Sequence, residues 1–118
     1  MKSIKYLVLI PLMVGCSQPS TETAFKELMD SEWSKVVIDN PVYASSMGDL
    51  SRNTEWPDTS VKNIYSDHQH QLNVLAQLQK LDTTQFTKEN KVNYSLFKKQ
   101  YENSIEAHAY QTFLIPFS

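Results

Sequence analysis

TKENKVNYSLFKKQYENSIEAHAY, residues 87–110, gives the clearest indication of the fold. Its apolar and aromatic residues recur every three or four positions, at Tyr94, Phe97, Tyr101, Ile105 and His108. This is the spacing of one face of an α-helix. Thr87 is a suitable N-cap residue, and the helix is expected to fade near Tyr110.

The preceding segment predicts a second long helix that ends near Leu81. Its apolar stripe consists of Val61, Ile64, Tyr65, His68, Leu72, Leu75 and Leu78. Asp58, Thr59 and Ser60 are candidate N-cap residues for this helix. The residues from Asp82 to Phe86 are then expected to form a linker between the two helices.

A further long helix is predicted from about Thr21 to Asp39, with Glu22 in its first turn, where an acid complements the helix dipole. The apolar face consists of Phe25, Leu28, Met29, Trp33, Val36 and Val37. We interpret Trp33 as a core aromatic residue, because it falls within this stripe.

Asn40 and Pro41 mark a break and a new start. A residue before proline is pushed out of the helical region, so the first helix should end there. Asn40 is a good N-cap and Pro41 is favoured at the first helical position, so a short helix is predicted to follow. Gly48 suits the left-handed position after that helix, and residues 49–59 read as a polar loop around Trp56.

These segments predict an all-α fold of three long amphipathic helices and one short helix, arranged as a loose bundle. Five of the last six residues, 113–118, are apolar or proline, whereas chain termini are usually polar. An apolar terminus needs something to cover it. We therefore expect the helices either to cover it themselves or to be an incomplete part of a larger helical fold.

The first 15 residues resemble a secretory signal peptide. Lys2 and Lys5 precede an apolar run from Tyr6 to Val14, and Gly15 is a small residue at its end. The run is shorter than the roughly 20 residues that span a bilayer. Residues 1–15 are therefore predicted to be removed on export.

Met13-Val14-Gly15-Cys16 is similar to the bacterial lipobox, whose cysteine is lipidated and becomes the first residue after cleavage. We expect Cys16 to carry a diacylglyceryl group and usually an N-acyl chain such as palmitate. Two or more acyl chains hold a protein firmly on a membrane. Residues 16–23 would then be a polar tether and residues 24–118 the helical domain. A free catalytic thiol and an incidental cysteine are the competing interpretations of Cys16.

The same resemblance to bacterial lipoproteins implies a location. An aspartate after the lipidated cysteine favours retention in the inner membrane of enteric-type bacteria, and this chain has Ser17 there. We expect the protein to be anchored in the cell envelope, in the outer membrane facing the periplasm rather than in the inner membrane.

The composition excludes several classes of function. Without Lys2 and Lys5 the chain has 9 of its 11 basic residues against 13 acidic ones, a formal charge of −4 (9 − 13), and Arg52 is its one arginine. Nucleic acid is therefore not an expected partner. Cys16 is the single cysteine, so no internal disulfide can form. Gly48 is the one glycine after the signal, which excludes glycine-rich phosphate loops and the Gly-x-Ser-x-Gly elbow.

The three histidines offer one conceivable metal site. His68 and His70 are two apart and point to different sides of a helix, so they cannot chelate one ion there. His68 and His108 lie on the apolar stripes of two helices that could pack together. A metal shared between them lacks further ligands, and we interpret them as core or boundary histidines.

The acidic and phenolic candidates are likewise interpreted as structural. Glu102 and Glu106 are four apart on one helix face, where paired carboxylates can do acid–base work, but a solvated face is the preferred interpretation. Asp49 and Asp58 read as turn and cap residues. Tyr94 and Tyr101 read as packing residues whose hydroxyls reach the rim. The sequence therefore assigns no catalytic residue, no metal ligand and no cofactor site.

The order of several short motifs is similar to the start of a family of bacterial lipoproteins known as domain of unknown function 885. The motifs are Glu32-Trp33, Asn40-Pro41, Ala44, Gly48-Asp49, Asn93-Tyr94-Ser95-Leu96, Glu102 and Leu114-Ile115-Pro116-Phe117. The resemblance runs from about Phe25 to the end of the chain. It implies longer, largely helical relatives, many with a His-Glu-x-x-His helix that makes them look like zinc metallopeptidases.

This sequence contains no His-Glu pair, so no catalytic residue carries over and zinc is expected only in longer relatives. We expect a membrane-anchored lipoprotein whose helices are an N-terminal scaffold segment for a peptidase-like domain. The alternative is a stand-alone small lipoprotein that binds a protein partner through an exposed helical face. A self-sufficient enzyme is the third hypothesis, for which the sequence offers no convincing nucleophile, metal set or phosphate cradle.

Overall fold

A computed structural model describes residues 20–115 of the chain. Its elements are the helices α1 (Thr21–Asp39), α2 (Pro41–Ser46), α3 (Val61–Gln79) and α4 (Lys88–Ala109), with a short 3-10 turn η1 (Thr112–Leu114). These residues form helices and turns without strands, so the predicted all-α fold is confirmed. The predicted signal peptide, Cys16 and residues 17–19 of the tether lie outside the described residues.

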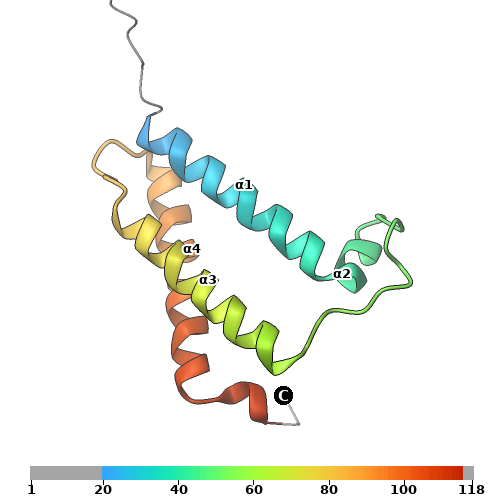
Figure 1. Cartoon of the computed structure of the whole chain (residues 1–118). Coiled ribbons are helices and arrows are strands. Elements are labelled where there is room, and N and C mark those ends of the chain that lie inside the picture. The colour runs from blue at the N-terminus through green and yellow to red at the C-terminus, as the bar shows by residue number, and fades with distance from the viewer. Residues whose placement is uncertain (1–19, 116–118) are drawn as a thin grey trace, which may run out of the picture.

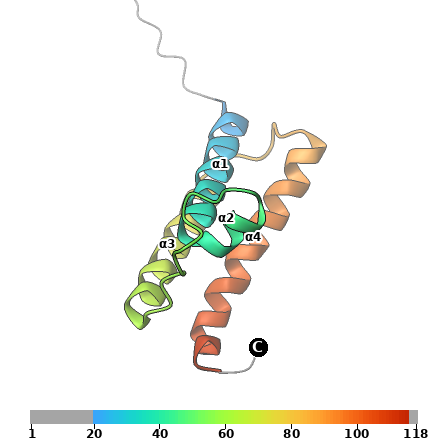
Figure 2. The same cartoon turned by 90° about the vertical axis from the view of Figure 1, so that its right-hand side faces the viewer.

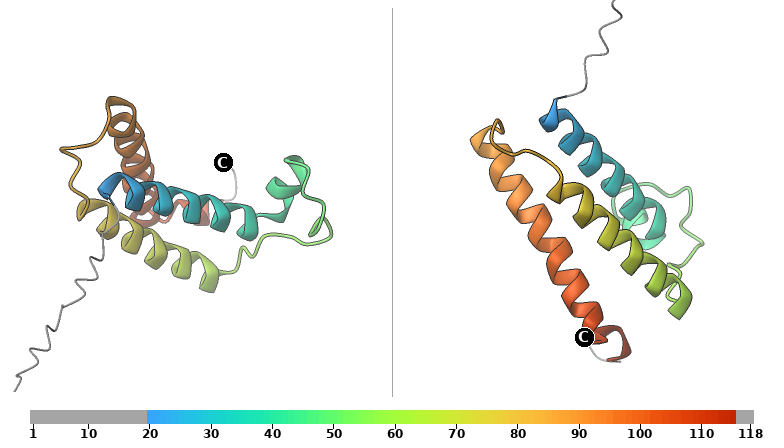
Figure 3. Two further views of the ribbon diagram at one scale, coloured as in Figure 1. Left: turned by 90° about the horizontal axis from the view of Figure 1, so that it is seen from above. Right: turned by 60° about the vertical axis from the view of Figure 1, so that its left-hand side comes forward.

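The three long helices pack side by side (Figure 1). α1 and α3 run in opposite directions, and α3 makes its most extensive contact with α4. Figure 2 shows α4 beside this pair, running from the N-terminal end of α1 towards η1. The short α2 turns away from the end of α1, and the loop after it leads back to α3 (Figure 3).

A polar side chain caps the start of every helix. Ser20, Asn40, Ser60 and Thr87 each accept a hydrogen bond from the backbone N–H three residues later, at 3.0–3.2 Å. Each cap satisfies one of the backbone donors that the first turn of a helix leaves free. Three of these residues, Asn40, Ser60 and Thr87, were predicted as caps from the sequence, which explains why the predicted helix starts are correct.

Gly48 ends α2 as predicted, with a φ of 95°. The backbone N–H of Gly48 bonds to the carbonyl of Ser45, and that of Asp49 bonds to the carbonyl of Ala44, both at 3.0 Å. This is the paired hydrogen-bond pattern of the Schellman motif, which requires a left-handed residue at the position of Gly48.

The apolar core lies at one end of the bundle. Phe25, Val74, Leu78 and Phe86 are its buried residues, and Tyr94 and Phe97 of α4 pack against them. The ring of Phe25 lies 5.5 Å from that of Phe86, 5.7 Å from that of Tyr94 and 6.2 Å from that of Phe97. These elements meet where α1 begins, α3 ends and α4 begins, so this end has the tightest packing.

Several sequence predictions about the core are wrong. Trp33 is 50% exposed and meets Tyr43 edge to face instead of entering the core, and Leu72 is also exposed. Phe86 lies in the linker between α3 and α4, as predicted, but its side chain is also part of the buried core. Trp33 is exposed because of the register of α1, whose buried face contains Phe25 and Glu32. Successive helical residues are rotated by about 100°, so an inward Glu32 turns Trp33 towards the side.

Candidate functional site

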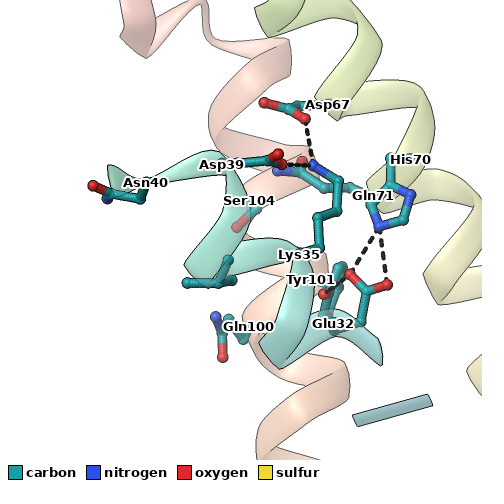
Figure 4. A pocket seen from close by; sticks show the side chains of 11 residues that line it. Glu32, Lys35, Asp39, Asn40, Asp67, His70, Gln71, Gln100, Tyr101 and Ser104 are labelled. Atoms are coloured by element: carbon teal, nitrogen blue, oxygen red, sulfur yellow. Dashed lines mark hydrogen bonds and ion pairs between the residues drawn. The ribbon is translucent and has the colours of Figure 1, made fainter. Parts of the chain in front are cut away.

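Glu32 is the one charged residue buried among those that the structure describes, with 7% of its surface exposed. It lies midway along α1, between α3 and α4. Its carboxylate contacts Nε2 of His70 on α3, at 3.0 Å from Oε1 and 2.8 Å from Oε2. The hydroxyl of Tyr101 on α4 donates to Oε2 at 2.6 Å (Figure 4). One carboxylate therefore joins three helices.

These hydrogen bonds offset the cost of burying a carboxylate. An ionised carboxylate only accepts, so Nε2 of His70 is the donor in this contact. Burial and the hydrogen bond to Glu32 raise the pKa of Tyr101 well above its ordinary range. Tyr101 therefore stays a hydroxyl donor throughout the physiological pH range.

Lys35 lies one turn further along α1 and makes a second link to α3. Its amine donates to Asp39 on its own helix and to Asp67 on α3, the latter at 2.9 Å. Partial burial lowers the pKa of Lys35, but the hydrogen bonds to the two carboxylates outweigh burial and raise that pKa overall. Lys35 therefore remains a cation, and its charge is shared between two acids.

The polar residues line an open cleft of about 280 Å³. Its walls come from α1, α3 and α4 and carry Glu32, Lys35, Val36, Asp39, Asn40, Asp67, His70, Gln71, Gln100, Tyr101 and Ser104 (Figure 4). A carboxylate that orients an imidazole also occurs in general-base sites. In this protein the Glu32 carboxylate also accepts a hydrogen bond from Tyr101. The neighbouring cation, Lys35, is bound by Asp39 and Asp67. The cluster thus connects the three helices.

His68 and His108 do come together, as their positions on two apolar stripes suggested. Their rings stack at 3.8 Å with an angle of 10° between planes. A metal ligand bond lies in the plane of the imidazole ring, and two parallel stacked rings cannot direct such bonds at one ion. Among the described residues, moreover, no group of three or more His, Cys, Asp or Glu side chains is placed to hold a metal.

His70 points away from this pair and towards Glu32, so the prediction that His68 and His70 face different sides is confirmed. Partial burial and the neighbouring His68 lower the pKa of His108. Nδ1 of His68 is buried and has no hydrogen-bond partner among residues 20–115.

The remaining candidates have local roles. Glu102 pairs with Lys98 at 3.7 Å on a half-exposed face. Asp49 and Asp58 accept hydrogen bonds from backbone N–H groups two residues later, which confirms the prediction of turn acids. The side chain and backbone of Ser51 lower the pKa of Asp49, and the backbone and side chain of Ser60 lower that of Asp58. The hydroxyl of Tyr94 donates to the carbonyl of Leu78 at 3.0 Å.

Sequence reasoning missed Glu32 and Lys35 as members of a site and took Tyr101 for a packing residue alone. A usable signal was present, because Glu32 follows Phe25 by seven residues and so falls on the same helix face as the core. A charged residue in an apolar register indicates a buried polar contact. The partners of Glu32 are His70 and Tyr101, which follow it by 38 and 69 residues on two other helices, and the spacing within α1 does not predict them.

Comparisons with known protein families, with curated proteins and with solved structures give no match to this chain. The resemblance described above therefore depends on its own short motifs. None of the helices within residues 20–115 is long and apolar enough to cross a bilayer.

Proposed function

We propose that this protein is a bacterial envelope lipoprotein that is anchored through lipid on Cys16 and whose helices serve as a scaffold. The anchor is inferred from the charged start, the short apolar run and the Gly15-Cys16 pair of residues 1–16. α1 begins at Thr21, so the tether between Cys16 and the helical body is only a few residues long. Such a tether keeps the body close to the lipid surface.

One observation carries the scaffold role: the residues of the family-like motifs hold positions that shape the backbone or join helices. Glu32 links three helices, Asn40 caps α2, and Gly48 ends it in a left-handed conformation. Pro41 and Ala44 are buried at the turn between α1 and α2. Motifs of this kind determine the backbone conformation and the packing of the helices. The hydrogen bonds of Glu32 are made to His70 and Tyr101 within the helical body.

The resemblance extends the proposal to a larger assembly. Residues 25–118 would be the N-terminal helical segment that supports a zinc-peptidase-like domain with its own His-Glu-x-x-His helix. The coding sequence beyond Ser118 tests this part. In-frame codons for such a helix would agree with the proposal, and their absence from every frame would contradict it.

Substitution of Cys16 tests the anchor. The wild-type protein, produced in a Gram-negative host, should incorporate labelled palmitate and sediment with membranes, because acylation buries long methylene chains. Cys16→Ser should take up no label and stay in the soluble fraction or retain its signal peptide. Ser17→Ala, one residue away, is the matched control and should behave as wild type. A Cys16→Ser protein that sediments and is cleaved normally would refute the anchor.

A second function is favoured by the surface around α2. Large apolar side chains are exposed there on the end of α1, on α2 and on the following loop, namely Trp33, Ile38, Val42, Met47, Leu50 and Trp56. Trp56 is the extreme case, with 85% of its surface exposed. Large apolar side chains exposed in one region of a surface mark protein contacts. The alternative proposal is a small lipoprotein that binds a protein partner through this face.

A photo-crosslinking residue distinguishes the two functions. Placed at position 56 in cells, it should give one discrete adduct if a dedicated partner covers the loop. Placed at position 88, an exposed lysine at the opposite end of the molecule, it should give none. Equal, diffuse labelling from both positions would contradict the partner-binding alternative.

A further inference from the structure

We propose that the stacked imidazoles of His68 and His108 form an acid-triggered switch, which holds the η1 turn against α3 and α4 at neutral pH and releases it on acidification. This goes beyond the scaffold and anchor functions, because it concerns a regulated movement within the helical body. The contact set consists of four aromatic side chains, Tyr65, His68, His108 and Phe113.

The ring of Phe113 connects η1 to the histidine pair. It stacks on His108 at 5.1 Å, with 28° between planes, and meets Tyr65 of α3 edge to face at 6.3 Å. Tyr65 also packs edge to face on His108 at 5.2 Å. Aromatic contacts with these geometries are attractive. His108 is therefore the centre of the contact that keeps the turn on the helices.

The backbone at this turn needs such a contact. Gln111, which joins α4 to η1, has a φ of 53°, in the left-handed region that a residue with a Cβ rarely adopts. A residue in this conformation persists when surrounding contacts hold it there. Loss of the Phe113 contact would leave the hydrogen bonds of the turn itself, from Gln111 to His108 and from Leu114 to Gln111, to hold this unfavourable conformation, which favours release.

Protonation opposes the stack. Two neutral imidazoles pack well face to face, whereas two imidazolium rings 3.8 Å apart repel each other. Nδ1 of His68 is buried without a hydrogen-bond partner in the described part of the chain, so a proton added there would find no acceptor in it. The stacked arrangement is therefore compatible with at most one charged ring.

The surrounding groups do not neutralise a second charge. Asp67 is the one acid that lines the adjoining cleft of about 310 Å³, and its carboxylate is bonded to Lys35 of α1 and to Asn63. Tyr65 is a neutral phenol. The C-terminal end of α4 favours a cation in principle, but the carbonyls of Glu106, Ala107 and His108 already receive hydrogen bonds from residues 110–112.

The sign of the pH dependence follows from His108. Partial burial and the charge of His68 lower its pKa below the ordinary 6.5, so the docked form binds fewer protons than the released form. Docking is then complete above pH 6.5 and is lost as the pH falls through the lowered pKa. For each extra proton bound, the ratio of released to docked turn rises up to about ten-fold per pH unit.

Nuclear magnetic resonance of the detergent-solubilised full-length protein tests the switch between pH 7.5 and 4.5. The cross-peaks between the rings of Phe113 and His108 should disappear as the Cε1–H signals of both histidines titrate, while the helical circular dichroism stays constant. Two variants separate charge from packing. His108→Phe keeps an aromatic ring and should hold the turn at every pH, and Glu27→Gln, an exposed titratable residue of α1 outside the contact set, should follow the wild-type profile.

Four results would overturn the proposal. The first is a Phe113–His108 contact that persists after both rings are protonated. The second is a His108→Phe protein that loses the contact on acidification as wild type does. The third is a pH dependence that Glu27→Gln removes. Helix loss that coincides with turn release in the wild type would assign the change to general acid unfolding and would also reject the switch.

Discussion

At the scale of single residues, the carboxylate of Glu32 is the feature that distinguishes this bundle from a simple apolar one. A buried charge is stable only when its partners are in place, and breaking such a contact leaves an uncompensated group in the interior. Glu32 has two partners on two other helices, His70 and Tyr101. The stability of the body should therefore depend on side chains that look ordinary in the sequence.

Tyr101→Phe tests this dependence. The change removes one hydroxyl that donates to a charged group, and such hydrogen bonds contribute about 1.5–3 kcal/mol. We expect a loss of this size in the free energy of unfolding in urea at pH 7. Tyr94→Phe is the matched control, since it removes a tyrosine hydroxyl that bonds to a neutral backbone carbonyl, and it should cost about 0.5–1.5 kcal/mol. Equal losses from the two changes would contradict the special role of Glu32.

The two large aromatic residues of α1 should respond very differently to truncation. Phe25 is fully buried, whereas Trp33 is half exposed. Phe25→Ala should destabilise the protein by about 3–5 kcal/mol, because it leaves a cavity in the core. Trp33→Ala should cost at most about 1 kcal/mol, since surface substitutions usually have small effects. Thermal denaturation followed by circular dichroism measures both, and a larger loss for Trp33→Ala would show that the register of α1 described above is wrong.

At the scale of elements, the turn from α2 into the loop depends on backbone conformation. Gly48 has a φ of 95°, and no atom lies within 4 Å of where a Cβ would be placed. Gly48→Ala therefore adds no steric overlap and isolates the cost of the left-handed backbone. That cost should be about 1–2 kcal/mol in the free energy of unfolding. Ser46→Ala, two residues earlier within α2, is the control, and a Gly48→Ala protein as stable as this control would contradict the strain argument.

The elements themselves could be predicted from the sequence to a large extent. Cap residues such as Asn40 and Thr87 and the break at Pro41 act locally, so the helix boundaries followed from them. The buried face of each helix was harder to predict than its boundaries. Periodicity places Trp33 and Phe25 on one broad apolar stripe and does not indicate which edge of the stripe faces the core. The polar cluster was not predictable, since the contacts of Glu32 join residues far apart in sequence. Tertiary packing, which no local pattern encodes, selected the register.

At the scale of the whole molecule, packing is unequal along the bundle. The buried apolar residues gather where α1 begins and α3 ends, whereas the other half contains the polar cleft and the histidine pair. Regions with few buried apolar contacts open first. We expect backbone amides around Val74 and Leu78 to exchange with deuterium at least ten-fold more slowly than those of the first two turns of α3. Uniform protection along α3 would contradict this picture.

The proposed location of the protein in the cell envelope can be tested at the scale of the whole molecule. If Cys16 is lipidated, the residue after it determines which membrane retains the protein. Ser17→Asp should move the protein from the outer to the inner membrane fraction on a sucrose gradient, and Ser17→Ala should leave it in place. An inner-membrane location of the wild type would contradict the proposed sorting.

Trp33 and Trp56, the two tryptophans of the chain, lie at the α2 end, and both are substantially exposed. Their indole emission in the native protein should already resemble that of a solvated chromophore, with little red shift left to occur on denaturation. A fluorimeter would therefore report almost nothing about melting of the aromatic core around Phe25. Because their emission should change little on unfolding, these indoles are good probes for a molecule that binds the surface around α2. Binding there would quench the emission or shift it to the blue, against a constant background.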